Sequence, residues 1–263
     1  MAPQPTPARE TTCKCCGARA QWFGSCDFSK NCHEHLGTVL PPSGISVHYY
    51  RCVECHFLFT TYFDNATYDD LKRIIYNDGY VCVDPDCLEN RPTNNAGFVA
   101  ECFSDHRTDV SILDYGGGNG VLAERLRALG FADVETYDPF YEEFAARPQR
   151  TFNIVLSFEV VEHVTKPVET MQDMARYLDA DCGLLMFTTM LSPADPDAYG
   201  MDWWYIAPRN GHCSIHSSKS LNMVLRQCGL TLTTATTNIA LHCAYREIPH
   251  FAEDFHRRMK IPG

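Results

Sequence analysis

The sequence contains no long apolar run. None of its segments reaches about 18 consecutive apolar residues, the length that a membrane-spanning helix needs. Its first ten residues hold three prolines and lack the apolar stretch of a secretory signal. We therefore expect a protein of the cytoplasm that does not act at a membrane, with a disordered leader at residues 1–10.

Positive charge is scarce as well. The chain has 22 Lys and Arg against 33 Asp and Glu, which gives a formal net charge of −11. Proteins that hold the phosphate backbone of a nucleic acid need a basic surface to do so. The composition thus argues against DNA or RNA as a substrate, and a small molecule is the expected partner.

Cysteine, in contrast, is abundant, with 14 residues. In a cytoplasmic chain these thiols are expected to be reduced, which favours metal ligands and buried side chains over disulfides. Two C-x2-C pairs, Cys13 with Cys16 and Cys52 with Cys55, offer four thiolates, the ligand set of a closed structural zinc site. We predict a zinc-binding module over residues 11–60, in which the metal folds a segment too small to bury its own core.

Other cysteines and histidines surround these pairs. Cys15 could replace one of its neighbours as a ligand. Cys26, Cys32, His33 and His35 lie between the two pairs without a clear spacing pattern. We expect these four to line a substrate cleft or a loop, with a second metal site as the alternative.

The rest of the chain falls into two parts. Residues 61–108 are interpreted as a connecting segment of short helices and loops, and no internal repeat is present. Residues 109–263 alternate strand and helix patterns, which predicts an α/β domain with a parallel sheet covered by helices. Strands are expected at 110–115, 133–138, 152–158, 183–191, 230–236 and 239–245, and helices at 69–76, 94–104, from 121, from 166 and from Ser218.

A glycine-rich turn follows the first of these strands. It reads Asp114-Tyr115-Gly116-Gly117-Gly118-Asn119-Gly120 and leads into a helix. Glycines at such a turn let the backbone approach a ligand closely. Asp138 ends the next strand, 22 residues beyond Gly116, the spacing of a carboxylate that accepts from ribose hydroxyls. Together they predict an adenosine-bearing cofactor at the carboxyl edge of the sheet.

The turn does not fit the NAD fingerprint. G-x-G-x-x-G needs a third glycine, and counting from Gly116 and Gly118 that position is Val121. The pattern G-x-G-x-G resembles motif I of class I, Rossmann-like methyltransferases that use S-adenosylmethionine. Further along, F-E-V-V-E-H at residues 158–163 resembles the E-V-x-E-H segment that follows the fourth strand in many small-molecule members.

This resemblance implies S-adenosylmethionine as the cofactor and a set of contacts to it. Asp138 would bind the ribose, Pro139 and Phe140 would border the adenine, and the loop would face the methionine part. The full implied set is Asp114, Gly116, Gly118, Asn119, Gly120, Asp138, Pro139, Phe140, Phe158, Glu159 and Val160. The third strand of the usual fold is short or missing between Phe140 and Phe152, which leaves the adenine edge less defined.

The cysteine pairs carry a second resemblance. C-K-C-C-G together with Y-Y-R-C-V-E-C is similar to the zinc-binding head of bacterial deoxysugar and nucleotide-sugar C-methyltransferases. With the cofactor motifs, the similarity spans about residues 13–245. It implies a Rossmann-like methyltransferase sheet with a small zinc module before it.

The acceptor is expected at residues 203–217, which are dense in aromatic and histidine residues. H-C-S-I-H-S from His212 resembles the H-x-S-x-x-S segment of sugar methyltransferases, with Asn210 in place of their first histidine. His212 is the first candidate for a general base and His216 the alternate, with Tyr205 or Tyr199 assisting by hydrogen bonds. The predicted substrate-binding residues are Trp203, Trp204, Arg209 and Asn210.

These features predict an enzyme that transfers a methyl group from S-adenosylmethionine to a small oxygen-rich acceptor, at oxygen or carbon. A sugar, a nucleotide-linked sugar or a glycan intermediate would suit it. Two alternatives stay open, since each of the candidate residues at 203–217 could instead have a structural role. One is a non-catalytic module that binds the cofactor and a partner protein, and the other is an NAD-dependent sugar oxidoreductase.

Overall fold

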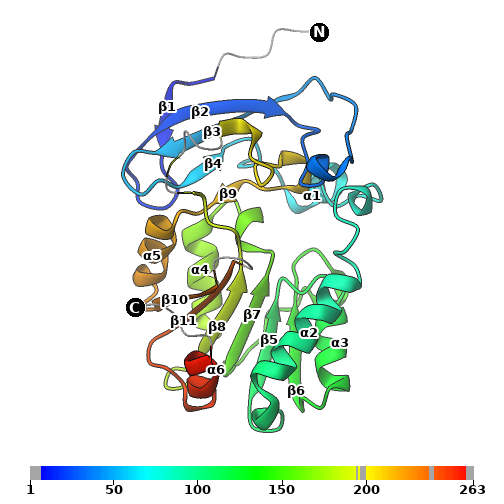
Figure 1. Cartoon of the computed structure of the whole chain (residues 1–263), viewed down its shortest axis with the longest axis vertical. Coiled ribbons are helices and arrows are strands. Elements are labelled where there is room, and N and C mark those ends of the chain that lie inside the picture. Colours follow the sequence, from blue (N-terminus) through cyan, green and yellow to red (C-terminus); the bar gives the residue numbers. More distant parts are fainter. Residues whose placement is uncertain (1–6, 194, 196–199, 237–239, 259–263) are drawn as a thin grey trace. The chain divides into compact units, whose positions relative to one another are not determined.

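The computed structural model describes residues 7–193, 195, 200–236 and 240–258 (Figure 1). The chain forms two compact units, each assembled from three stretches of sequence. The first unit contains Met1–Pro85, Glu162–Val168 and Met190–Val224, and the second contains Asp86–Val161, Glu169–Thr189 and Leu225–Gly263. No helix within the described ranges is both long and apolar enough to cross a membrane.

The second unit is built on a six-stranded sheet with the order β10-β11-β8-β7-β5-β6. Its strands are β5 (Ser111–Tyr115), β6 (Asp133–Tyr137), β7 (Ile154–Phe158), β8 (Leu184–Thr188), β10 (Thr231–Thr236) and β11 (Leu241–Tyr245). Strands β8, β7, β5 and β6 run parallel to one another. Beyond β8 the sheet continues with β11 and β10, and each of these is antiparallel to its neighbour. The predicted α/β class with a parallel-containing sheet is confirmed.

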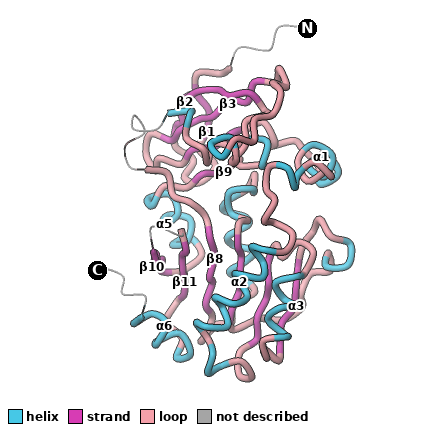
Figure 2. The backbone as a smooth tube through the Cα atoms, turned by 45° about the vertical axis from the view of Figure 1, so that its right-hand side comes forward, coloured by secondary structure: helices cyan, strands magenta, loops and turns pink. Residues whose placement is uncertain are grey.

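Helices cover this sheet on both faces. They are α2 (Asn90–Cys102), α3 (Val121–Ala128), α4 (Pro167–Arg176) and α6 (Glu253–Arg258), while α5 (Ser218–Gln227) begins in the first unit and ends in the second. Figure 2 shows α2 and α3 side by side, and their apolar faces share one core with Ile112 of β5. Since side chains alternate along a strand, Tyr115 points to the opposite face, where its hydroxyl donates to Asp173 of α4 at 2.9 Å.

The sheet has no strand between β6 and β7. Residues 138–153 are all described, and they form one 3-10 turn, Glu142–Phe144, in place of a strand. The expected gap between Phe140 and Phe152 is therefore real, and β6 is an edge strand.

The first unit is built on a five-stranded antiparallel sheet with the order β1-β2-β3-β4-β9. Its strands are β1 (Glu10–Thr12), β2 (Arg19–Asp27), β3 (Ser46–Cys52), β4 (Leu58–Thr60) and β9 (Ser214–Ile215), and its helix is α1 (Tyr68–Ile74). The core beneath the sheet contains Tyr49, Leu58, Tyr205 and Ile215. Thr67 and Asp70 cap α1 reciprocally, which fixes where that helix begins.

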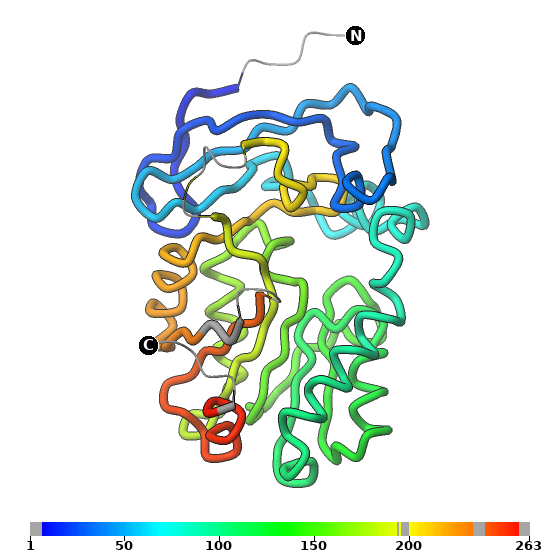
Figure 3. The backbone as a smooth tube through the Cα atoms, viewed as in Figure 1, coloured from blue at the N-terminus to red at the C-terminus, as the bar shows by residue number. Residues whose placement is uncertain are grey.

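The division between the units differs from the predicted boundaries. Residues 162–168 and 190–224 belong to the first unit, although the sequence pattern grouped all of 109–263 together. The reason is the pairing of β9 with β4, in which Ile215 lies opposite Leu58. Figure 3 traces the backbone through both units, coloured by residue number. The helix expected from Ser218 does begin there, and its cap is the preceding Ser217, whose hydroxyl accepts from the Ser220 amide at 3.0 Å.

Candidate functional site

The glycine loop leaves the carboxyl end of β5 and leads into α3. Gly116, Gly118 and Gly120 have φ angles of 75°, 57° and 77°, a region that residues with a Cβ rarely adopt. A Cβ at Gly116 would lie 2.5 Å from Val160 Cγ2, and one at Gly120 would lie 2.7 Å from the Phe144 ring. The alternating glycines are therefore required by the backbone, and Phe144 is a neighbour of the loop that the sequence did not indicate.

Asp114 lies under this loop as the fourth residue of β5. Its side chain is buried, and its Oδ2 has no hydrogen-bond partner among the described residues. Burial, together with the nearby charge of Asp138, raises the pKa of Asp114 to about 7. A Cβ at Gly117 would overlap the Asp114 carboxylate, so a glycine is needed there as well.

Asp138 follows β6 and also faces the loop. Its Oδ2 accepts from the Gly118 amide at 2.9 Å, and its Oδ1 accepts from the Phe140 amide at 2.7 Å. The carboxylate therefore ties the glycine loop to the segment after β6. Each carboxylate oxygen can accept a second hydrogen bond, so this arrangement is compatible with a bound ribose.

Glu159 follows β7 at the same edge of the sheet. It has a φ of 55°, an uncommon conformation for a residue with a side chain. Thr188, at the end of β8, holds it there, because the Thr188 hydroxyl accepts from the Glu159 amide at 2.9 Å and donates to Oε1 at 2.8 Å. A strained residue held in this way is a frequent feature of ligand sites.

The remaining predicted cofactor residues lie around this edge. Val160 packs against Gly116, and Pro139, Phe140 and Phe158 are half-buried at the ends of their strands. Asn119 is different, since its side-chain amide donates to the Leu88 carbonyl at 3.1 Å. Its side chain anchors the loop to the segment before α2.

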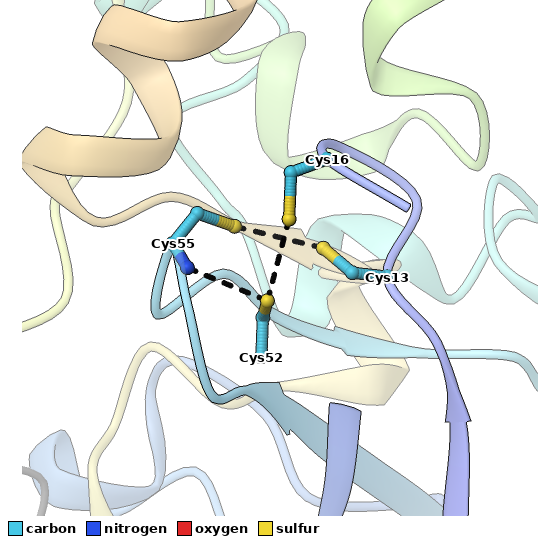
Figure 4. Close-up of side chains that lie close together, drawn as sticks. All are labelled: Cys13, Cys16, Cys52 and Cys55. Carbon is cyan, nitrogen blue, oxygen red and sulfur yellow. Dashed lines mark hydrogen bonds between the residues drawn. The ribbon is translucent and has the colours of Figure 1, made fainter. Parts of the chain in front are cut away.

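The two cysteine pairs come together in the first unit. Cys13 and Cys16 lie between β1 and β2, Cys52 ends β3 and Cys55 lies between β3 and β4, and the four sulfur atoms converge (Figure 4). All four ligand atoms are within 4.8 Å of one another, with Cys13 Sγ 3.6 Å from Cys55 Sγ and Cys16 Sγ 3.5 Å from Cys52 Sγ. None of the four forms a disulfide.

Both pairs have the same backbone structure. The amide of Gly17 donates to the Cys13 carbonyl at 3.0 Å, and the amide of His56 donates to the Cys52 carbonyl at 3.2 Å. Gly17 and His56 both have positive φ angles, 73° and 62°. Cys15 lies outside the four-sulfur group.

Tyr205 and His212 lie together in the core of the first unit. His212 Nδ1 donates to the Tyr205 carbonyl at 2.8 Å, and the Tyr205 hydroxyl donates to Glu162 Oε1 at 2.7 Å. The His163 ring stands edge-on to that of His212, with centroids 5.0 Å apart. Glu162 and His163 belong to the E-V-V-E-H motif, so the sequence carried the signal but did not indicate that they would meet His212.

Two other candidates for the acceptor region, His216 and Arg209, have different contacts. His216 is fully buried, packs against Phe57, and pairs with the Ser220 hydroxyl at 3.1 Å through Nδ1. The Arg209 guanidinium donates to the Ile75 carbonyl at 3.0 Å and to Asn77 Oδ1 at 3.2 Å. These contacts join segments of the first unit.

Asn210 joins two further segments. Its Oδ1 accepts from the Cys32 amide at 2.9 Å, and its Nδ2 donates to the Val83 carbonyl at 3.1 Å. The Cys32 thiol in turn lies 3.9 Å from His212 Nε2. Cys26, Cys32, His33 and His35 do not belong to either candidate metal group that the described residues contain.

The two tryptophans differ in exposure. Trp203 is half-buried and packs against the core around Tyr49, whereas Trp204 keeps 37% of its surface exposed. The Trp204 ring lies edge-on to Tyr205 at 5.3 Å and beside His35 at 5.6 Å. Tyr199, the second tyrosine considered for an assisting role, lies outside the described residues.

Comparison with solved structures shows a shared fold at low sequence identity. An O-methyltransferase family protein from Burkholderia thailandensis has 13% identity and a TM-score of 0.51, with 67% of this chain and 62% of that chain covered. This chain thus spans less than two thirds of that protein's length. The methyltransferase CalO1 of calicheamicin biosynthesis, in a form with bound SAH, has 17% identity and a TM-score of 0.42, with coverages of 66% and 60%.

A magnesium protoporphyrin IX methyltransferase from Synechocystis, also with bound SAH, has 15% identity and a TM-score of 0.41, with coverages of 71% and 97%. No curated protein sequence matches the chain. The sequence model of one family, described as a methyltransferase domain, matches residues 87–235, which is more than half of the 263 residues. The predicted enzyme class is confirmed at this level: the chain belongs to the methyltransferase-domain family.

Proposed function

We propose that the chain transfers the methyl group of S-adenosylmethionine to a small oxygen-rich acceptor, such as a sugar, a nucleotide-linked sugar or a glycan intermediate. The observation that carries this proposal is the edge of the second unit's sheet. There the carboxyl ends of β5, β6 and β7 bring together the glycine loop, Asp138 and Glu159. Ligands of open α/β sheets bind at this edge.

The residues at this edge fit the cofactor. Asp114 supplies a buried carboxylate oxygen that lacks a partner among the described residues, which suits a cationic or hydrogen-donating group such as the amino group of the methionine part. Asp138 keeps acceptor capacity for ribose hydroxyls. Bound there, S-adenosylmethionine supplies an electrophilic methyl group, and the glycine loop lets the backbone approach it closely.

A histidine of the first unit would take up the acceptor's proton. Because His212 Nδ1 donates to a carbonyl, the neutral ring carries its lone pair on Nε2. A neutral histidine in this tautomer can serve as a general base near neutral pH. Tyr205 positions it, since its carbonyl fixes the ring and its hydroxyl holds Glu162.

Trp204 is the aromatic side chain that suits stacking on a sugar ring, because it is exposed and lies next to Tyr205. Arg209 and Asn210 support this region through the bonds described above, and Trp203 contributes to its core. We therefore propose Trp204, with Tyr205 and His35 beside it, as the place where the acceptor binds.

The four-cysteine group would bind structural zinc. With Zn–S bonds of about 2.3 Å, the sulfur atoms of a tetrahedral site lie about 3.7 Å apart. The observed separations of 3.5 and 3.6 Å are close to this value. Metal analysis should find about one zinc per chain.

Cofactor identity is tested by titration calorimetry. Asp138→Asn should weaken the binding of S-adenosylmethionine at least tenfold, because it removes the negative charge at the ribose. Asp133→Asn, at the other end of β6, is the matched control and should change the affinity less than twofold. Stabilisation by NAD instead would support the oxidoreductase.

Turnover is tested with methyl-labelled S-adenosylmethionine in a cell extract, followed by mass analysis of the labelled products. Label in sugars or nucleotide sugars is the expected result, and the active product then serves as the assay. His212→Gln should lower turnover by about 10²–10⁴ at unchanged cofactor affinity. A loss in His216→Gln alone would assign the base to His216, and binding without any transfer would support the non-catalytic module.

A further inference from the structure

A second cluster of ligand-type side chains lies in the first unit, apart from the four cysteines. Glu162, His163 and His212 each direct one nitrogen or oxygen atom into a common region, and these atoms lie within 4.8 Å of one another. Glu162 and His212 are fully or nearly fully buried, at 0% and 5% exposure. The proposed base thus has a carboxylate and a second imidazole beside it.

The backbone holds the two contributing segments together. The Cys213 amide donates to the Glu162 carbonyl at 2.8 Å, and the Ser214 hydroxyl donates to the Val164 carbonyl at 2.6 Å. These bonds flank the cluster on both sides. The segments that carry the three side chains are therefore joined, within the same unit, by one main-chain bond and one bond from a serine hydroxyl.

Tyr205 orients two of the three side chains. Its carbonyl accepts from His212 Nδ1, which directs the lone pair of the neutral ring to Nε2, and its hydroxyl donates to Glu162 Oε1. Metal-binding histidines usually donate their other ring nitrogen to a carbonyl or carboxylate in this manner, and liganding carboxylates are hydrogen-bonded in turn. The cluster therefore has the outer support that ligands of a metal ion receive.

Gly211 lets the His163 ring come close. It has a φ of 91°, and a Cβ at this position would lie 3.2 Å from His163 Nδ1. A larger residue would be strained and would press on the imidazole. The glycine before His212 thus permits the approach of the two rings.

We infer that Glu162, His163 and His212 bind a divalent transition-metal ion. Two imidazoles and one carboxylate form a ligand set that suits zinc, cobalt and related ions, and three protein ligands leave further positions open. Metal–ligand bonds of about 2.1 Å place such atoms roughly 3.4 Å apart. Small side-chain movements would achieve this from separations of up to 4.8 Å.

The ion would occupy the lone pair of His212 that is proposed to accept the acceptor's proton. Filling the site should therefore inhibit methyl transfer, in contrast to the four-cysteine site, where metal supports the fold. This inhibitory consequence rests on the proposed function, whereas the binding of the ion does not.

The test is a titration with Co²⁺ alone of protein that carries one zinc per chain, at the four cysteines. One equivalent should bind, with the weak d–d absorption of nitrogen and oxygen ligands and without intense thiolate-to-cobalt charge transfer. Saturable binding should be weakened at least about 100-fold in His163→Gln, and by about 10–100-fold in Tyr205→Phe, which removes only the orienting hydroxyl. His250→Gln changes an exposed histidine and should bind as the unmodified protein does.

Replacing zinc by Co²⁺ in each variant provides the folding control, since thiolate charge-transfer bands appear only if the four cysteines still converge. Absence of saturable Co²⁺ binding, or full binding in His163→Gln, would overturn the inference. Co²⁺ bound by Glu162, His163 and His212 should also lower turnover on the identified acceptor. Undiminished turnover with the site filled overturns the inhibitory role alone, while absence of any turnover counts against the proposed function and leaves the binding result intact.

Discussion

The two units of the chain differ in the interactions that stabilise each of them internally. In the second unit, side chains of α2, α3 and α6 form one apolar core with the sheet strands that neighbour them in the chain. In the first unit, polar bonds join distant segments: Lys30 Nζ donates to the carbonyls of Trp203 at 2.8 Å and Ile206 at 2.6 Å, and the Tyr49 hydroxyl donates to the His212 carbonyl at 2.6 Å. Each unit has an apolar core, and in the first unit specific polar bonds between distant segments add to this burial.

Removing the proposed zinc ion should destabilise the first unit and leave the second unit folded, which is the largest expected difference between them. A strong chelator, or Cys52→Ser, should abolish the structure of the first unit, because structural zinc contributes on the order of 10 kcal/mol in small domains. Hydrogen exchange read by mass spectrometry should show lost protection in β2 and β3 and retained protection in β5 and β7. Cys82→Ser, which changes an exposed cysteine of the same unit, is the control and should leave protection unchanged.

The pH dependence of stability should reveal the buried carboxylate of the second unit. Asp114 has a folded pKa of about 7, above the ordinary value, so its contribution is full below about pH 4 and is lost as the pH rises through 7. Asp114→Asn should remove this loss, on the order of 4 kcal/mol at pH 8, in urea unfolding of the cofactor-free protein. It should also weaken cofactor binding, and equal pH profiles for both proteins would contradict the assignment.

Crowding the glycine loop should have a smaller effect. In Gly117→Ala the new methyl group would overlap the Asp114 carboxylate and approach Thr136, which should cost about 2 kcal/mol of folding free energy and weaken cofactor binding. Gly97→Ala is the matched control, since nothing lies within 4 Å of a Cβ there and the position is inside α2. It should stabilise the chain by about 0.5–1 kcal/mol.

The smallest expected change in stability is at Trp204. Because its ring is 37% exposed, Trp204→Ala should alter the unfolding free energy by less than about 1 kcal/mol. It should raise the KM for the acceptor while the affinity for the cofactor stays constant. An unchanged KM would remove Trp204 from acceptor binding, and a large loss of stability would show that its contacts with Tyr205 are structural.

The elements of the second unit were predictable because each depends on local patterns. All six strands and helices α2 to α4 lie within a few residues of their predicted positions, and the missing strand between β6 and β7 was anticipated. Apolar periodicity and the glycines carry that information within about ten residues. The sequence could not show that Asp114 lies under the glycine loop near Asp138, because burial depends on the assembled sheet.

In the first unit the sequence predicted helix α1 and the convergence of the paired cysteines, but little else. The C-x2-C pairs indicated four thiols that do converge. By contrast, β9 has two residues and no recognisable strand pattern, and its pairing with β4 joins Leu58 to Ile215. The approach of His163 to His212 and the link from Lys30 to Trp203 are equally non-local, so no window of sequence contains them.

The pairing of β4 with β9 has a consequence for synthesis on the ribosome. At about 5–20 residues per second, the interval between Thr60 and Ser214 takes roughly 10–30 s to translate. During this time four strands of the first sheet are available, and β4 has an uncovered edge that could pair with another nascent chain. The early cysteine cluster, complete at residue 55, would let the zinc ion hold this unfinished sheet until its last strand emerges.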